Sequence, residues 1–351
     1  MSNIPSINIS GRRIALDAPP YVIAELSANH NGKLETAMKI VEEAKNAGAD
    51  AVKLQTYTAD TITLDCDSEE FQIHGGLWDG KTLYQLYQEA HMPWDWHKPL
   101  FEHARKLGIT IFSSPFDNTA IDLLEDLNTP AYKIASFEAI DLPLIKYAAS
   151  TGKPMIISTG MADAEEIQEA IDAARAGGCK ELAILHCVSG YPAPAEDYNL
   201  GTIPDMLKRF GLVTGLSDHT LDNTTAIASV VLGASIIEKH FTLDRNGGGP
   251  DDSFSVEPKE LQALCKDSKT AWSALGTVNY QKKSSEQANL KFRRSLYVVR
   301  DIAPGELLTE QNIKSIRPGY GLEPKHFDSM LNKKAKCSLK AGTPLSFDHV
   351  D

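Results

Sequence analysis

Short apolar runs alternate with helical patterns along most of this chain. The runs are 21–27, 51–57, 110–115, 131–136, 154–159, 181–187, 212–219 and 235–241. Each is followed by a segment in which apolar residues recur at helical spacing, the first at 34–48 and the last at 258–275. Glycines stand at several of the helix ends, as at Gly48, Gly108 and Gly178. The pattern therefore predicts an α/β fold of eight strands, each followed by a helix.

Eight such βα units in about 250 residues are typical of a closed (β/α)8 (TIM) barrel, which we place at residues 1–276. The alternative is an open doubly wound sheet. That alternative is less favoured because no Gly-x-Gly-x-x-Gly fingerprint follows the first strand.

The composition becomes polar after Leu275, and residues 277–291 have the character of a linker. Residues 292–351 show short strand patterns, Pro-Gly and Ala-Gly turns and little helix. A unit this small is only marginally stable alone, so we expect it to dock on a barrel.

The totals narrow the class of protein. A net charge of −12 argues against nucleic acid or an anionic membrane as a partner. Five cysteines without a CxxC pair fit reduced thiols. The N-terminal segment lacks the apolar core of a signal peptide, and no apolar run approaches the length of a membrane span. We therefore expect a soluble, cytoplasmic protein.

The last two strand patterns carry candidate metal ligands. Ser217 and His219 are two residues apart, as are Glu238 and His240, so each pair shares one strand face. Residues 221–233 are long enough for one crossover helix, which would make these strands parallel neighbours. Two imidazoles and a carboxylate would suit a divalent metal. The alternative is that the histidines are hydrogen-bonded structural residues.

Other polar residues fall at the strand ends, where a barrel carries its chemistry. They are Glu25, Lys53, Gln55, Ser114, Lys133, Ser136, Glu138, Ser158, Ser189, Ser217, His219, Glu238 and His240. Lys53 and Lys133 lie in apolar strands, where an unpaired ammonium is costly. Each could be half of an internal ion pair. Together with the serines they indicate a pocket for a small anion bearing phosphate and carboxylate groups.

Two long loops interrupt the pattern. Residues 58–96 are rich in Gly and aromatic residues, and a loop of this length is usually functional. Residues 243–258 follow the eighth strand; their glycine run predicts mobility, and Asp251 adds charge. We expect this second loop to lie over the pocket. Arg317 stands in an RPGYG motif of the small domain; an exposed structural arginine is the alternative to a binding role.

With these residues in hand, the chain resembles the sialic acid synthase family over nearly its full length. The motifs are IAELSANHNG (23–32), AVKLQTY (51–57), SSPFD (113–117), PAYKIAS (130–136), STGM (158–161), LHCVSGYP (185–192), GLSDHT (215–220), EKHFT (238–242) and RPGYG (317–321). The resemblance implies a (β/α)8 barrel with a C-terminal antifreeze-like (SAF) domain in a domain-swapped homodimer. It also implies condensation of phosphoenolpyruvate with an N-acetylated deoxy amino sugar, with Mn²⁺ or Mg²⁺ as cofactor and release of phosphate.

Residues 75–97 and 247–258 resemble the subgroup that forms pseudaminic acid, whose sugar is 2,4-diacetamido-2,4,6-trideoxy-altrose. Leu77, Trp78 or Phe254 would then face the sugar's C6 methyl group. The alternatives are an N-acetylneuraminate or legionaminate synthase, another metal-dependent barrel aldolase or hydrolase, and a non-catalytic sugar-binding protein.

The resemblance also implies a role for each matching residue. His219 and His240 would hold the metal, Glu25 a sugar hydroxyl, and Glu138 the attacking water. The phosphate and carboxylate would be held by Lys53, Ser114, Lys133, Ser136, Ser158, Ser189 and Ser217. Ser189 stands where sialic acid synthases tend to carry Asn. The supporting contacts would come from Gln55, Tyr191 and Asp251. Arg317 would reach the sugar's acetamido group from the partner chain.

Overall fold

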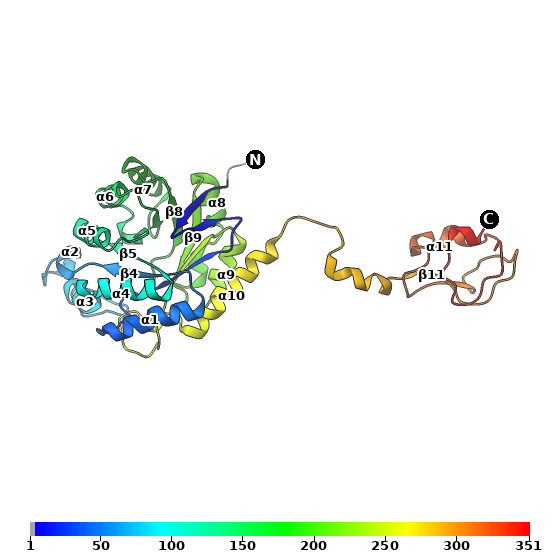
Figure 1. The fold of residues 1–351 in the computed structure, drawn as a ribbon, viewed down its shortest axis with the longest axis horizontal. Helices are drawn as coiled ribbons and strands as arrows, with labels where there is room; N and C mark the ends of the chain where they lie inside the picture. Colours follow the sequence, from blue (N-terminus) through cyan, green and yellow to red (C-terminus); the bar gives the residue numbers. More distant parts are fainter. Residues whose placement is uncertain (1–3) are drawn as a thin grey trace. The chain divides into compact units, whose positions relative to one another are not determined.

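The computed structural model describes residues 4–351, so the first three residues of the predicted barrel domain lie outside it. The chain divides into two compact units, Met1–Gly276 and Thr277–Asp351 (Figure 1).

The first unit is built on a closed barrel of eight parallel strands, as the sequence predicts. The strands are β3 (Tyr21–Glu25), β4 (Ala51–Thr56), β5 (Thr110–Pro115), β6 (Tyr132–Ile134), β7 (Met155–Ser158), β8 (Leu182–Cys187), β9 (Val213–Asp218) and β10 (Ile236–His240). They follow one another in chain order around the barrel, and β10 closes it by pairing with β3.

Helices surround this barrel (Figure 1). They are α1 (Leu34–Ala47), α4 (Trp94–Leu107), α5 (Asn118–Asp126), α6 (Leu142–Ser150), α7 (Ala164–Ala176), α8 (Thr202–Phe210), α9 (Thr224–Val231) and α10 (Pro258–Leu275). Gly48 and Gly108 end α1 and α4 in the left-handed conformation, as predicted. The predicted crossover at 221–233 contains α9, so β9 and β10 are parallel neighbours.

Short elements fill the connections between these strands and helices. They are α2 (Ala59–Ile62), η1 (Glu69–Phe71), α3 (Leu83–Ala90), η2 (Ser136–Glu138), η3 (Ala195–Tyr198) and η4 (Asp252–Phe254).

An N-terminal hairpin, which is not among the eight predicted strands, covers the N-terminal end of the barrel. Its strands β1 (Ser6–Ile9) and β2 (Arg12–Ala15) are joined at Ser10 and Gly11, both with positive φ as a tight hairpin turn requires. Ile7, Ile9 and Ile14 are buried in one cluster with the residues that begin the barrel strands. The N-terminal end of the barrel is therefore packed with apolar side chains.

The side chains that face the barrel interior change from apolar to polar along the strands. In β10, Ile236 joins the apolar cluster, whereas Glu238 and His240 line a cavity further along the strand. At Gly215 in β9, an added Cβ would lie 2.5 Å from the carbonyl oxygen of Ile236, so only glycine fits there. The chemistry is thereby concentrated at the C-terminal ends of the strands, as expected for this barrel.

The second unit has a small core of its own. It contains η5 (Ser284–Phe292), β11 (Ser295–Val298), β12 (Ile313–Ile316), η6 (Pro324–His326), α11 (Phe327–Met330) and η7 (Phe347–His349). Strands β11 and β12 pair in antiparallel fashion, and Leu296, Ile313 and Leu345 are fully buried. Part of the predicted linker is helical, because η5 begins at Ser284.

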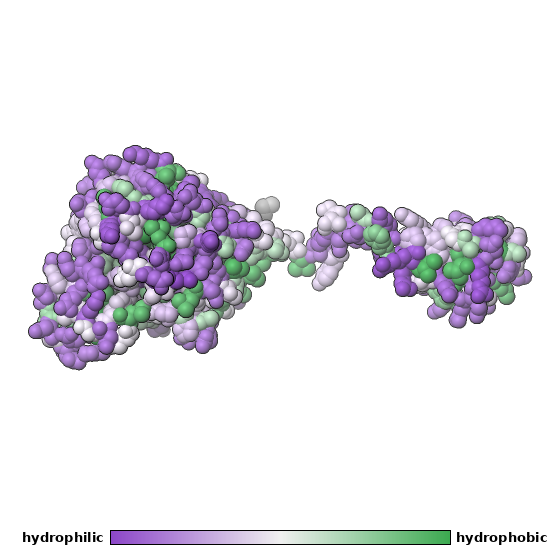
Figure 2. Space-filling model, turned by 90° about the horizontal axis from the view of Figure 1, so that it is seen from below, coloured by the Kyte–Doolittle hydropathy of each residue, from purple (hydrophilic) through white to green (hydrophobic). Residues whose placement is uncertain are grey.

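Polar side chains cover most of the face of the chain shown in Figure 2, and apolar residues occur there in small groups. Within residues 4–351, none of the helices combines the length and the apolar character needed to cross a membrane.

Candidate active site

A cavity of about 550 Å³ lies at the C-terminal ends of the barrel strands. Most of the residues that the sequence singles out line its wall. They are Lys53, Gln55, Lys133, Ser136, Glu138, Ser158, Ser189, Tyr191, Ser217, His219, His240 and Asp251. Residues far apart in the chain thus meet in one cavity because consecutive parallel strands end at the same rim.

Two barrel residues of the predicted catalytic and substrate-binding set, Glu25 and Ser114, do not line the cavity. Glu25 is 1% exposed, and its carboxylate contacts Lys53 Nζ at 2.7 Å and Gln55 Nε2 at 3.0 Å. Ser114 is fully buried and accepts a hydrogen bond from Lys53 Nζ at 3.2 Å. These two residues support the wall from behind. Arg317 is an exposed residue of the second unit, directly after β12.

A network of buried charges forms the floor of the cavity. The Oε1 atom of Glu238 lies 3.7 Å from Lys53 Nζ and 3.5 Å from Lys133 Nζ. Strands β6 and β10 are on opposite sides of the barrel, so the contact between Lys133 and Glu238 crosses its interior. Both lysines are therefore halves of internal ion pairs, and both also face the cavity.

Burial and these ion pairs determine the charges of the network. Burial by itself would raise the pKa of Glu238, but the ammonium groups of Lys133 and Lys53 outweigh it and lower that pKa. Burial by itself would lower the pKa of Lys53, but Glu238 and Glu25 outweigh it and raise that pKa. Burial raises the pKa of Glu25 to about 7 against the opposing charge of Lys53. Burial also lowers the pKa of Lys133. The network therefore offers positive charge that is only partly neutralised.

Hydroxyl groups complete this part of the wall. Ser136 Oγ and Ser189 Oγ are 2.9 Å apart, and Ser217 Oγ donates to Glu238 Oε1 at 3.4 Å. Ser158 Oγ is buried and has no hydrogen-bond partner among residues 4–351. A buried hydroxyl without a partner is costly, so a ligand oxygen at this position would be stabilising. Lysines and hydroxyls of this kind suit the oxygens of a phosphate or carboxylate.

The two predicted metal ligands face each other. The ring centroids of His219 and His240 are 5.4 Å apart. His219 Nδ1 donates to the carbonyl oxygen of Val188 at 2.7 Å, which leaves the lone pair on its Nε2. Burial lowers the pKa of His219 to about 4, and burial also lowers the pKa of His240 well below its usual value. Both rings are neutral at pH 7 and can donate a lone pair to a metal.

These imidazoles fit a cation that takes its other ligands from water or substrate. His240 Nδ1 is buried without a hydrogen bond within the described residues, and Asp251 Oδ2 lies 3.8 Å from it. No group of three or more His, Cys, Asp and Glu side chains in residues 4–351 is arranged to hold a metal. Glu238, which the sequence groups with the imidazoles, has its Oε1 atom between the two lysines, whereas its Oε2 atom has no hydrogen-bond partner within the described residues.

Glu138 contributes a buried carboxyl group to the cavity wall. It ends the short helix η2, lines the cavity, and its Oε2 atom has no partner among the residues that the structure describes. Burial raises its pKa to about 7. A carboxylate with this pKa can both accept and donate a proton near neutral pH.

The loop at 58–96 forms an apolar part of the cavity wall. Ile62, Ile73, Trp78, Leu83 and Leu86 all line the cavity. Of these, the sequence analysis singled out Trp78 alone. For Leu83 and Leu86 a sequence signal exists, because their helical spacing places both on one face of α3.

The other two residues predicted for this wall lie elsewhere. Leu77 is 52% exposed. Phe254 is buried, with its ring 5.4 Å from that of Tyr191 and 5.1 Å from that of His240. It supports the two cavity residues from behind.

The second loop joins this wall. Trp78 Nε1 donates to the carbonyl oxygen of Pro250 at 3.3 Å, and Asp251 lines the cavity. Two glycines of the run, Gly247 and Gly249, are closely packed: an added Cβ at Gly249 would lie 2.0 Å from Asn31 Oδ1. Asp252 Oδ2 holds the same segment by accepting from Gly249 N at 2.8 Å.

Comparison with known proteins agrees with this geometry. Residues 40–280 match the NeuB family, and residues 293–351 match the SAF domain. The chain is 47% identical to a pseudaminic acid synthase of Helicobacter pylori, over 95% of this chain and 98% of that protein. It is 43% identical to a pseudaminic acid synthase of Campylobacter jejuni, over 94% of this chain and 96% of that protein.

A similar solved structure is that of N-acetylneuraminic acid synthetase from Leptospira borgpetersenii in complex with citrate. It superposes with a TM-score of 0.73 at 30% sequence identity and covers 84% of this chain and 98% of that chain.

Proposed function

The chain belongs to the NeuB family, and we propose that it catalyses the pseudaminic acid synthase reaction. In this reaction phosphoenolpyruvate, 2,4-diacetamido-2,4,6-trideoxy-altrose and water give pseudaminic acid and phosphate. The observation that carries the proposal is one cavity lined by two buried lysines, several serines, two neutral imidazoles and an apolar wall.

The phosphate and carboxylate of phosphoenolpyruvate bind to the lysines and serines. Lys53 and Lys133 supply the charge, and Ser158 supplies a hydroxyl that lacks a partner in the protein. Because Glu238 neutralises only part of this charge, the network can accept an anion. Holding both substrates at one rim replaces a bimolecular encounter, which can contribute roughly 7–11 kcal/mol to lowering the barrier.

The sugar lies between this network and the apolar wall. Its C6 methyl group and acetamido methyl groups suit Ile62, Ile73, Leu83 and Leu86, which have no polar group to offer a C6 hydroxyl. Gln55, Tyr191 and Asp251 supply polar contacts from the same cavity. This apolar wall favours a 6-deoxy sugar over a sugar with a C6 hydroxyl.

The bond changes follow from this placement. The C3 carbon of phosphoenolpyruvate attacks the sugar's aldehyde carbon, which leaves an oxocarbenium centre at C2, and the aldehyde oxygen takes up a proton. Glu138 removes a proton from the water that adds at C2. The tetrahedral intermediate then loses phosphate by cleavage of the C2–O bond. A divalent cation held by His219 and His240 would supply Lewis-acid polarisation of the aldehyde oxygen.

Three finer features belong to the same proposal. Mn²⁺ is the favoured metal, and the protein acts in the cytoplasm. Two chains form a domain-swapped homodimer in which Arg317 of one chain contacts the sugar bound by the other. The small separate core of the second unit and the exposure of Arg317 support this arrangement.

The test measures phosphate release with a panel of N-acetylated aldehyde sugars in the presence of Mn²⁺. We expect the fastest release with the 2,4-diacetamido-2,4,6-trideoxy-altrose. Phosphoenolpyruvate labelled with ¹⁸O at the bridging position should transfer that label to phosphate. A clear preference for N-acetylmannosamine or the legionaminate precursor would contradict the sugar assignment, and label retained in the sugar acid would contradict C–O cleavage.

A further inference from the structure

A buried ion pair lies directly behind the two imidazoles. Asp218 precedes His219 at the end of β9, and Lys239 precedes His240 in β10. Asp218 and Lys239 are Cα partners and form the last pair of the β9–β10 ladder. Side chains alternate along a strand, so this pair faces away from the cavity while the imidazoles face into it.

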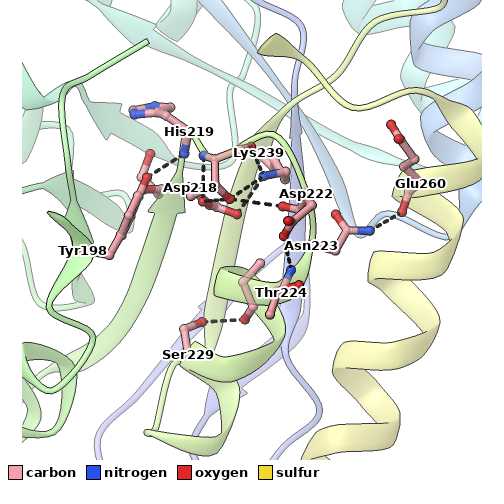
Figure 3. Close-up of polar contacts among 12 residues, drawn as sticks. Tyr198, Asp218, His219, Asp222, Asn223, Thr224, Ser229, Lys239 and Glu260 are labelled. Carbon is pink, nitrogen blue, oxygen red and sulfur yellow. Dashed lines mark hydrogen bonds and ion pairs between the residues drawn. The ribbon is translucent and has the colours of Figure 1, made fainter. Parts of the chain in front are cut away.

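The ion pair also binds the segment that follows His219. Lys239 Nζ lies 2.7 Å from Asp218 Oδ2 and donates to the carbonyl oxygen of Thr220 at 2.6 Å (Figure 3). Asp218 Oδ1 accepts from Thr220 N at 3.0 Å and from Thr220 Oγ1 at 2.9 Å. The residues on both sides of His219 are therefore attached to the strand that carries His240.

His219 is fixed by other contacts as well. Its backbone N–H donates to the hydroxyl oxygen of Tyr198 at 2.6 Å (Figure 3). Its carbonyl oxygen accepts from Ala193 N at 3.1 Å. Its ring donates to the carbonyl oxygen of Val188. With the ring of His219 held in this way, its separation from His240 depends on how closely β9 and β10 are joined at their ends.

Stability alone does not explain this ion pair. Both side chains are 1% exposed, and replacing such a pair by neutral residues of similar size is often neutral or stabilising. We propose that Asp218 and Lys239 are positioning residues that set the distance and orientation of His219 and His240 for a divalent cation. The inference rests on the proposed function, because the cation does.

The test compares Mn²⁺ binding by the full chain and by the neutral double variant Asp218→Asn/Lys239→Met. Free Mn²⁺ is measured by electron paramagnetic resonance during titration, and thermal unfolding monitors the fold. We expect Mn²⁺ to bind roughly 10- to 100-fold more weakly to the double variant, as is typical when a partner behind the ligands is lost. The KM for phosphoenolpyruvate should stay within about twofold while kcat falls, because the lysines of the cavity are unchanged.

Lys153→Met is the matched control, since Lys153 pairs with Glu125 at 2.6 Å outside the cavity. It should leave Mn²⁺ affinity unchanged. Thr220→Val is a milder second variant, which keeps both charges and removes only the hydroxyl bound to Asp218. We expect severalfold weaker Mn²⁺ binding, and this variant decides the question if the double variant does not fold.

His240→Ala separates this inference from the proposed function. The positioning role alone would be overturned if His240→Ala loses Mn²⁺ binding while the folded double variant keeps it unchanged. If the double variant does not fold, unchanged Mn²⁺ binding by Thr220→Val would overturn it in the same way. Absence of Mn²⁺ binding by the unaltered chain would overturn the metal assignment and the positioning role together.

Discussion

Replacing Lys133 with Met separates the two roles that this lysine has in the structure. Lys133 pairs with Glu238 across the barrel, and it also lines the cavity. The substitution removes the charge and keeps most of the side-chain volume. It should therefore weaken both the fold and the binding of phosphoenolpyruvate, and the two losses can be measured independently.

The loss of stability is limited by the rest of the network. Two unit charges 3.5 Å apart attract by about 4–5 kcal/mol at an effective dielectric constant near 20. The substitution also relieves the cost of burying the ammonium group, and Lys53 stays 3.7 Å from Glu238. We therefore expect a loss of about 3 kcal/mol, the lower end of the range for breaking a buried pair.

The loss of binding follows from one charge-assisted contact. Such a hydrogen bond contributes about 1.5–3 kcal/mol, so the dissociation constant of phosphoenolpyruvate should rise roughly 10- to 150-fold. Equilibrium dialysis with labelled phosphoenolpyruvate measures it at a temperature where the variant is folded. Lys153→Met is the control that should retain normal affinity. A folded Lys133→Met variant that binds phosphoenolpyruvate within twofold of the unaltered chain would show that Lys133 serves only its ion pair.

Three further substitutions test other parts of the site. Glu138→Gln should lower kcat by 10²-fold or more and abolish the acidic limb of the pH–rate profile near pH 7. In the unaltered enzyme the rate rises through this limb as Glu138 loses its proton. If the limb persists in the variant, another group is responsible for it. Gly160→Ala should weaken phosphoenolpyruvate binding at least tenfold, because the added Cβ would lie 2.4 Å from the Cβ of Ser136. Gly152→Ala is the control: its added Cβ meets no atom within 4 Å, and it shares only the cost of a positive φ. Equal effects of the two substitutions in binding assays would contradict a role for local packing. His240→Ala should abolish Mn²⁺ binding and turnover while the fold stays intact. Titration measures Mn²⁺ binding, and circular dichroism checks the fold. If the variant is as active as the unaltered chain with added Mn²⁺, the ligand assignment is refuted.

The eight barrel strands were predictable because their signal is local. Each strand is a short apolar run followed by a helical pattern, and parallel strands in one barrel end at one rim. The same rule brought residues as distant as Gln55 and His240 to one cavity, which the structure bears out.

The partners in the ion pairs were not predictable, because they depend on the three-dimensional arrangement of the barrel strands. Glu238 follows the same alternation as His240, so its spacing favoured a metal ligand. Its Oε1 atom also lies 3.5 Å from Nζ of Lys133, which comes from the opposite side of the barrel, and only the closed barrel reveals that distance. The pairing of Asp218 with Lys239 likewise depends on the β9–β10 register.

Two apolar features were missed for different reasons. The hairpin at β1 and β2 does alternate apolar and polar residues, as in Ile7 and Ile9, but it precedes the first βα unit. The wall from the 58–96 loop needs Ile62 and Leu86 to line the same cavity, and this depends on how the loop folds back.

A crystal structure with phosphoenolpyruvate and Mn²⁺ tests the central claim most directly. We expect Mn²⁺ bound by His219 and His240, with the phosphate and carboxylate of phosphoenolpyruvate within hydrogen-bond distance of Lys53, Lys133 and Ser158. Imidazoles that bind no metal, or a cavity without phosphoenolpyruvate at saturating concentration, would contradict it.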